Sequence, residues 1–174
     1  MKKNAFILIA ILVLSSGFKT GGHIDTNSRI KAVFILNFTK LIEWPKTYRS
    51  GNFVVGVVGE TPLYNELSKM AKVKKVAAQS LTIKKFKSTA DIGKCHILYV
   101  TKSQSSQIKD VLKKVKDNST LIVTEQVGLA SRGAGINFVV KNNRQKFELN
   151  KTNVEKYNLK VSSNLESLAV SVKK

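Results

Sequence analysis

The residue types that most often carry catalysis are few in this sequence, and their spacing does not assemble a catalytic site. The histidines are His23 and His96, and the only cysteine, Cys95, directly precedes His96. A thiol beside an imidazole could act as a nucleophile and its base, but adjacent residues of a strand point to opposite faces. Zinc sites need three or four ligands at close approach, so two histidines predict no metal site. We therefore expect no catalytic residue and no metal ligand.

Sequence motifs for phosphate, dinucleotide or acyl chemistry are also missing from the chain. It contains no G-x-S-x-G, no P-loop and no G-x-G-x-x-G. Gly56 and Gly59 bracket the end of a predicted strand, where backbone geometry is a sufficient reason for glycine. These observations predict a protein that is not an enzyme and binds no cofactor.

The first 17 residues have the order of a secretory signal peptide. Two lysines precede the apolar run from Ala5 to Leu14, and small residues follow at Ser15 to Gly17. The run has ten residues, whereas a helix that crosses a membrane needs roughly 20. We therefore expect export, cleavage near residue 17 and no membrane-spanning segment in the mature chain.

The exported part is strongly basic. Without Lys2 and Lys3 it keeps 28 basic and 11 acidic residues, a formal net charge of +17. Such a charge favours anionic lipid headgroups, acidic protein surfaces or nucleic acid. Only four of the basic residues are arginines, and export also argues against nucleic acid as a partner.

Strands alternate with helices through most of residues 28–172, which we expect to form one domain. Continuous apolar runs predict strands covered on both faces. Between them, apolar residues at helical spacing predict helices. This order predicts an α/β fold, a three-layer α/β/α sandwich with a mostly parallel sheet. The predicted strands are 53–58, 81–86, 96–100 and 120–124, followed by an antiparallel hairpin of 136–140 and 145–149 that ends the sheet.

Two helix starts are predicted after the hairpin. Asn150 is a candidate structural polar residue, because its side chain can cap a short helix that ends near Asn158. Ser163 and Glu166 have the spacing of a capping box, and the apolar spacing of Leu165 to Val172 predicts that a packed helix closes the domain.

The stretch from residue 27 to Trp44 predicts the first helix, which Pro45 ends. Asn37 lies inside its apolar arc, so we expect a buried amide that hydrogen-bonds the facing strands. Leu36 near the polar side, Trp44 and Pro45 are the candidate contacts with a partner protein. The predicted arc consists of Ile30, Val33, Phe34, Phe38, Leu41, Ile42 and Trp44.

Five blocks, in order, resemble the YfiR family of small exported proteins. They are Lys31-Ala32-Val33-Phe34 through Asn37-Phe38 to Glu43-Trp44-Pro45, then Cys95 to Val100, Gly133 to Phe138, Lys146 to Asn150, and Leu159 to Ala169. The resemblance implies a periplasmic, non-catalytic regulator with a three-layer α/β/α fold, often dimeric. Such a regulator binds the periplasmic part of an inner-membrane diguanylate cyclase and holds it inactive, which lowers cyclic di-GMP and biofilm formation. In the best-known members, paired cysteines form disulfides that make the activity of the regulator depend on redox state. In this chain Cys95 has no second cysteine to pair with.

A second hypothesis stays open beside this one. The chain could be a periplasmic ligand-sensing module that acts on another membrane signalling protein, such as a sensor kinase or a receptor. A protein-binding regulator should expose an apolar patch, whereas a sensor should enclose a pocket with convergent polar groups.

Overall fold

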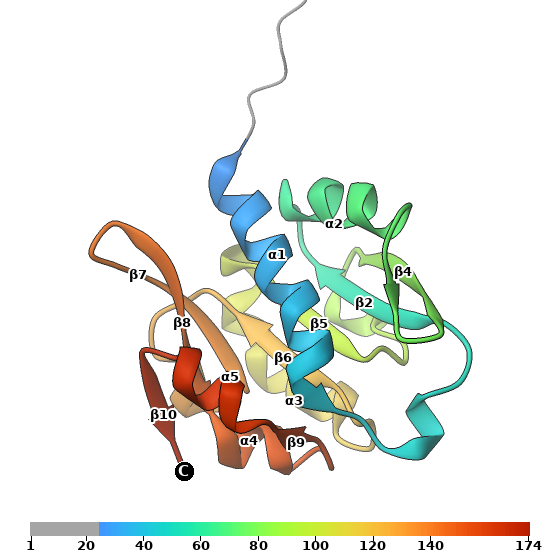
Figure 1. The fold of residues 1–174 in the computed structure, drawn as a ribbon. Coiled ribbons are helices and arrows are strands. Elements are labelled where there is room, and N and C mark those ends of the chain that lie inside the picture. The colour runs from blue at the N-terminus through green and yellow to red at the C-terminus, as the bar shows by residue number, and fades with distance from the viewer. Residues whose placement is uncertain (1–24) are drawn as a thin grey trace, which may run out of the picture.

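The computed structural model describes residues 25–174, so the predicted signal peptide at 1–17 lies outside the described residues. Helices and strands alternate along the described chain (Figure 1). None of the described helices combines the length and apolar character needed to cross a membrane. The helices are α1 (Thr26–Leu41), α2 (Leu63–Ala71), α3 (Ile108–Val115), α4 (Lys151–Glu155) and α5 (Ser163–Leu168), with short 3-10 helices at Lys46–Tyr48, Thr89–Asp91, Lys102–Gln107 and Leu129–Arg132.

The strands form one large sheet and one small one. The large sheet has the order β10-β8-β7-β6-β5-β2-β4-β3, and the small sheet pairs β1 with β9. All neighbours in the large sheet are parallel except β7 with β8 and β3 with β4. The strands are β1 (Ile42–Glu43), β2 (Phe53–Val58), β3 (Lys75–Val76), β4 (Gln79–Phe86), β5 (Ile97–Val100), β6 (Leu121–Thr124), β7 (Ile136–Lys141), β8 (Arg144–Asn150), β9 (Lys160–Val161) and β10 (Ser171–Lys173).

The predicted α/β sandwich with a mostly parallel sheet is confirmed. Helix α2 connects β2 to β4, and α3 connects β5 to β6 in the opposite direction across the sheet. Right-handed crossovers in opposite directions place their helices on opposite faces. Figure 1 accordingly shows α1 in front of the sheet and α3 behind it, and α1 packs beside α2.

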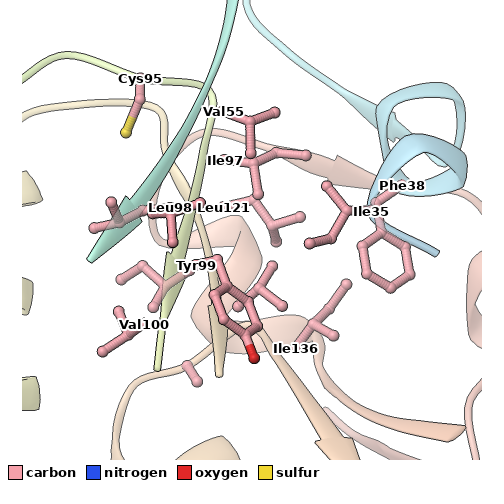
Figure 2. Packing of buried hydrophobic residues seen from close by; sticks show 14 of the residues in the cluster. Ile35, Phe38, Val55, Cys95, Ile97, Leu98, Tyr99, Val100, Leu121 and Ile136 are labelled. Carbon is pink, nitrogen blue, oxygen red and sulfur yellow. The ribbon is translucent and has the colours of Figure 1, made fainter. Parts of the chain in front are cut away.

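Continuous apolar strands form the core between these layers. Every residue of β5 and β6 is buried, as the apolar sequence of both strands predicts. Figure 2 shows Ile35 and Phe38 of α1 facing side chains of the central strands. The core therefore holds α1 against the sheet by apolar contact along its buried face.

The first helix is shorter than predicted. Helix α1 ends at Leu41, and Ile42 and Glu43 form β1, where they pair with Val161 and Lys160 of β9. The backbone N–H of Ile42 still donates to Phe38, so the pairing starts where the helical hydrogen bonds end. Extending the helix to Trp44 was wrong because the contact with β9, distant in sequence, outweighs the local pattern.

The end of the chain also differs from the prediction. The last helix, α5, covers only Ser163–Leu168, and its cap is Ser162, whose Oγ accepts the Leu165 N–H at 3.2 Å. The chain then returns as β10, parallel to β8, so the β7–β8 hairpin does not end the sheet. The hairpin itself is confirmed, with Asn142 and Asn143 at positive φ in its turn.

The cap predicted at Asn150 is confirmed. Its Oδ1 accepts the backbone N–H of Asn153 at 3.0 Å and so satisfies the first turn of α4. Its Nδ2 donates to the Ala130 carbonyl at 2.7 Å, so Asn150, which is buried, uses both ends of its amide.

Candidate functional site

Helix α1 buries a face that only partly overlaps its predicted apolar arc, since Phe38 of that arc is buried but Ile30 and Val33 are not. Its buried residues include Ala32, Ile35 and Phe38, whereas Ile30 is 37% exposed and Val33 is 46% exposed. Thr39, which lies outside the predicted apolar arc, is buried, and its hydroxyl donates to the Leu36 carbonyl at 2.7 Å. The helix thus has apolar side chains on two sides and turns only one of them to the sheet.

Asn37 lies on the outward side of α1, and the prediction of a buried amide was wrong. Its side chain is exposed, beside Val33 and Phe34. The four residues Ile30, Val33, Phe34 and Asn37 have i, i+3, i+4 and i+7 spacing and share one side of the helix. We call these four residues the exposed α1 face.

A groove of about 380 Å³ runs along this face at the start of α1. Phe34, half-buried, packs against the β7–β8 hairpin, with ring centroids 6.0 Å from Phe138 and 5.7 Å from Phe147. Two buried aromatic rings therefore hold Phe34, which lines the groove, in place. The groove is lined by Thr26, Arg29, Ile30, Val33, Phe34 and Asn37.

A second groove, of about 290 Å³, lies on the other side of Val33 and Asn37, between α1 and α2. Leu36 and Met70 are its half-buried apolar residues, and lysines stand around them. Leu36 therefore lies beside the exposed α1 face, and its contact with a partner is still a prediction. The groove is lined by Val33, Leu36, Asn37, Thr39, Lys40, Met70, Lys74 and Lys75.

The rim of the two grooves is basic. Arg29 lines the first groove, and Lys40, Lys74 and Lys75 line the second. Within residues 25–174 none of these four cations forms an ion pair. An acidic surface with apolar side chains at its centre would complement this site.

Trp44 belongs to the core rather than to this surface. It is 5% exposed, and its ring packs edge-on against Phe53 at 5.0 Å between centroids. Turning the chain from α1 into β1 carries Trp44 inward, so naming it a partner contact was wrong. Pro45 is half-buried beside a separate hollow that Arg49 also lines, and its role in partner contact is still a prediction.

The Lys31–Glu125 ion pair fixes the rotation of α1 on the sheet. Glu125 directly follows β6, and its other oxygen accepts the Lys102 N–H at 3.2 Å. Burial acts to raise the pKa of Glu125, but the hydrogen bond and the charge of Lys31 outweigh it and hold this pKa below its usual value. A charged pair on the sheet side keeps the opposite side of α1 turned outward.

Cys95 and His96 do not form a reactive pair. The ring of His96 accepts the Val54 N–H through Nδ1 at 3.0 Å and has its Nε2 2.8 Å from the Tyr48 carbonyl. Both ring nitrogens are therefore engaged by backbone groups. Burial raises the pKa of the Cys95 thiol to about 12, so it stays protonated near neutral pH.

The fold and the exposed α1 face define a small α/β sandwich domain with an open apolar surface and a basic rim. Residues 25–174 contain no cluster of His, Cys, Asp and Glu that could hold a metal ion. The chain belongs to the YfiR/HmsC-like family, whose sequence model matches residues 28–170. This family is periplasmic and regulatory rather than catalytic.

Two solved structures share the fold. A conserved domain protein from Vibrio cholerae O1 biovar eltor has a TM-score of 0.55 at 16% identity, over 84% of this chain. The ABC domain in complex with L-Trp from Streptococcus pneumonia has a TM-score of 0.50 at 11% identity, over 68% of this chain. The chain spans 60% and 54% of those two chains, and at such identities the likeness shows the fold alone. None of the curated proteins compared with this chain matches it.

The sequence did not indicate most of the surface around α1. Ile30 and Val33 were assigned to the core, because a helical wheel groups apolar residues without saying which group meets the sheet. Met70 and Lys74 reach the second groove through the packing of α2 beside α1, which no local pattern encodes.

Proposed function

We propose that the mature chain is a periplasmic regulator that binds the periplasmic part of an inner-membrane diguanylate cyclase and holds the cyclase inactive. Membership of the YfiR/HmsC-like family supports a regulatory role in the periplasm. The exposed α1 face, with Ile30 and Val33 at 37% and 46% exposure, is the observation that carries the proposal. Leu36 and Met70 extend the apolar surface into the second groove.

Inhibition needs only binding, provided that the regulator prefers one state of its partner. A ligand shifts a conformational equilibrium by as much as its affinities for the two states differ. Moving a cyclase from about 99% to about 1% active takes a preference of about 10⁴-fold for the inactive state. The regulator would then lower cyclic di-GMP, and biofilm formation with it, without any catalytic residue of its own.

The charge and the shape of this site indicate which kind of partner surface would fit it. Arg29, Lys40, Lys74 and Lys75 surround an apolar centre, so the partner should present apolar side chains ringed by Asp and Glu. A second copy of this chain carries the same basic rim, which opposes self-association through this face. A homodimer, if the protein forms one, should therefore use another surface and leave α1 free.

The experiment is a deletion combined with recovery of the partner. Deleting the gene that encodes this protein should raise cellular cyclic di-GMP. The tagged mature protein should recover a diguanylate cyclase from solubilised inner membranes. Unchanged cyclic di-GMP together with recovery of no signalling protein would overturn the proposal. Recovery of a sensor kinase or receptor instead would favour the sensing hypothesis.

A further inference from the structure

The β7–β8 hairpin has one basic side and one apolar side. In its register Phe138 lies opposite Phe147 and Lys141 lies opposite Arg144. Side chains alternate along a strand, so Phe138 and Phe147 share the side that packs against α1. Lys141, Arg144 and Lys146 share the other side.

The basic side places like charges directly opposite each other. Lys141 and Arg144 are cross-strand partners and both are exposed, an arrangement that destabilises a sheet unless a counter-charge is present. Among residues 25–174 neither they nor Lys146 form an ion pair. The acid on this side of the hairpin is Glu148, whose Oε2 accepts the Asn137 amide at 3.1 Å.

These cations line a hollow at the end of the hairpin. Its volume is about 440 Å³, and its lining consists of Lys141, Asn142, Arg144 and Lys146. The lining contains no apolar side chain that could hold the anchor residue of a peptide. Such a site suits an anion with many oxygens better than a folded acidic protein.

The end of the hairpin is a tight turn and carries an exposed apolar residue beside it. Asn142 and Asn143 have φ of 51° and 56°, as a tight two-residue turn requires. Figure 1 shows the hairpin extending beyond the rest of the sheet. Val140, 67% exposed, precedes Lys141 and lies on the other side of the strand.

We propose that the end of the β7–β8 hairpin binds anionic phospholipid headgroups. Lys141, Arg144 and Lys146 contact the headgroup phosphates, and Val140, at the same end of the hairpin but on the opposite side of the strand, enters the interfacial layer. The formal charge of +17 on the exported part adds attraction at longer range. The proposal does not depend on the partner of α1, because Phe138 and Phe147 separate the basic side from the exposed α1 face.

The test measures binding of the mature protein to vesicles of phosphatidylglycerol in phosphatidylcholine, with pure phosphatidylcholine vesicles as the neutral arm. Wild type should bind the anionic vesicles and not the neutral ones. The triple variant K141Q/R144Q/K146Q should bind about a hundredfold more weakly, since each basic residue near an anionic surface adds about fivefold. The matched control is K109Q/K114Q/K116Q, which removes the same charge from exposed residues in and just after α3.

Three outcomes would overturn the proposal. Wild type could fail to bind anionic vesicles, the two triple variants could lose affinity equally, or polyglutamate could bind the wild type as tightly as the vesicles do. Equal losses would assign binding to net charge alone, and polyglutamate binding would indicate an acidic protein partner.

A second variant tests the site without removing charge, in case the triple variant does not fold. Val140→Trp places an indole at the end of the hairpin, on the opposite side of the strand from the cations, and its emission should shift to the blue on anionic vesicles. Val127→Trp is the control at another exposed position, where Val127 is 85% exposed and lies outside the hairpin. No shift in Val140→Trp, or an equal shift in both variants, would contradict insertion of the hairpin.

Discussion

Lys31 on α1 and Glu125 at the end of β6 form an ion pair across 94 residues of sequence. Their side chains are only 16% and 20% exposed, so the pair is shielded from most of the solvent. This contact and the apolar side formed by Ala32, Ile35 and Phe38 together set the rotation of α1. They leave Ile30 and Val33 facing outward.

Replacing Glu125 by Gln should lower the free energy of unfolding by about 2 kcal/mol at pH 7, because Lys31 loses its charged acceptor. Urea denaturation measures the loss. Glu60→Gln is the control, since Glu60 is 85% exposed and its pair with Lys85 is worth less than about 1 kcal/mol. Equal losses in the two variants would contradict the special role of the pair.

The same pair predicts a loss of stability in acid. The pKa of Glu125 is lowered in the native state, so its contribution is present above the ordinary value of 4.5 and is lost as the pH falls through the native pKa. Wild type should therefore lose more stability than Glu125→Gln below about pH 4.5. Parallel pH profiles would show that the carboxylate gains nothing from Lys31.

The lowered pKa of His96 predicts a second pH range in which the stability of the native state changes. Burial lowers the pKa of His96, so the native state resists protonation and stability falls as the pH drops below the ordinary value of 6.5. NMR titration in a His23→Gln background should show the His96 ring titrating below its ordinary pKa of 6.5. If the ring titrated at its ordinary pKa, the inference that His96 is buried with both nitrogens engaged by backbone groups would be wrong.

Trp44 is the only tryptophan, so its fluorescence reports directly on its burial. We expect blue-shifted emission that iodide quenches poorly. Trp44→Ala should lower the free energy of unfolding by about 3–5 kcal/mol, whereas Trp44→Phe keeps the contact with Phe53 and should cost much less. Strong quenching in the native state would instead restore Trp44 as a surface contact.

The sequence predicted the strands well because their signal is local. Phe53–Val58 and Leu121–Thr124 are apolar runs whose composition alone requires cover on both faces. The turn at Asn142 and Asn143 was predictable for the same reason, since these residue types accept positive φ. Such features depend on a few neighbours in sequence.

The ends of α1 and of the chain depend on distant partners, and there the prediction failed. Ile42 joins β9, and Val172 joins β8, through pairings that no local pattern contains. The candidate site failed in the same way. Ala32 and Ile35 are as apolar as Ile30 and Val33, so only the shape of the sheet and the position of Glu125 decide which pair is exposed.

The exposed α1 face is the central claim for function, and Val33→Glu tests it. A carboxylate at this position, already 46% exposed, adds a like charge opposite an acidic partner with little effect on folding. Val127→Glu introduces the same charge at a residue that is 85% exposed and lies outside the face. Circular dichroism and urea denaturation should give similar stability for both variants and wild type.

The most direct measurement is the affinity of these three proteins for the purified periplasmic domain of the diguanylate cyclase recovered from membranes, by titration calorimetry without lipid. We expect wild type and Val127→Glu to bind alike and Val33→Glu to bind at least about tenfold more weakly, a loss of about 1.4 kcal/mol. Equal affinity of Val33→Glu and wild type would contradict the assignment of the α1 face as the regulatory surface.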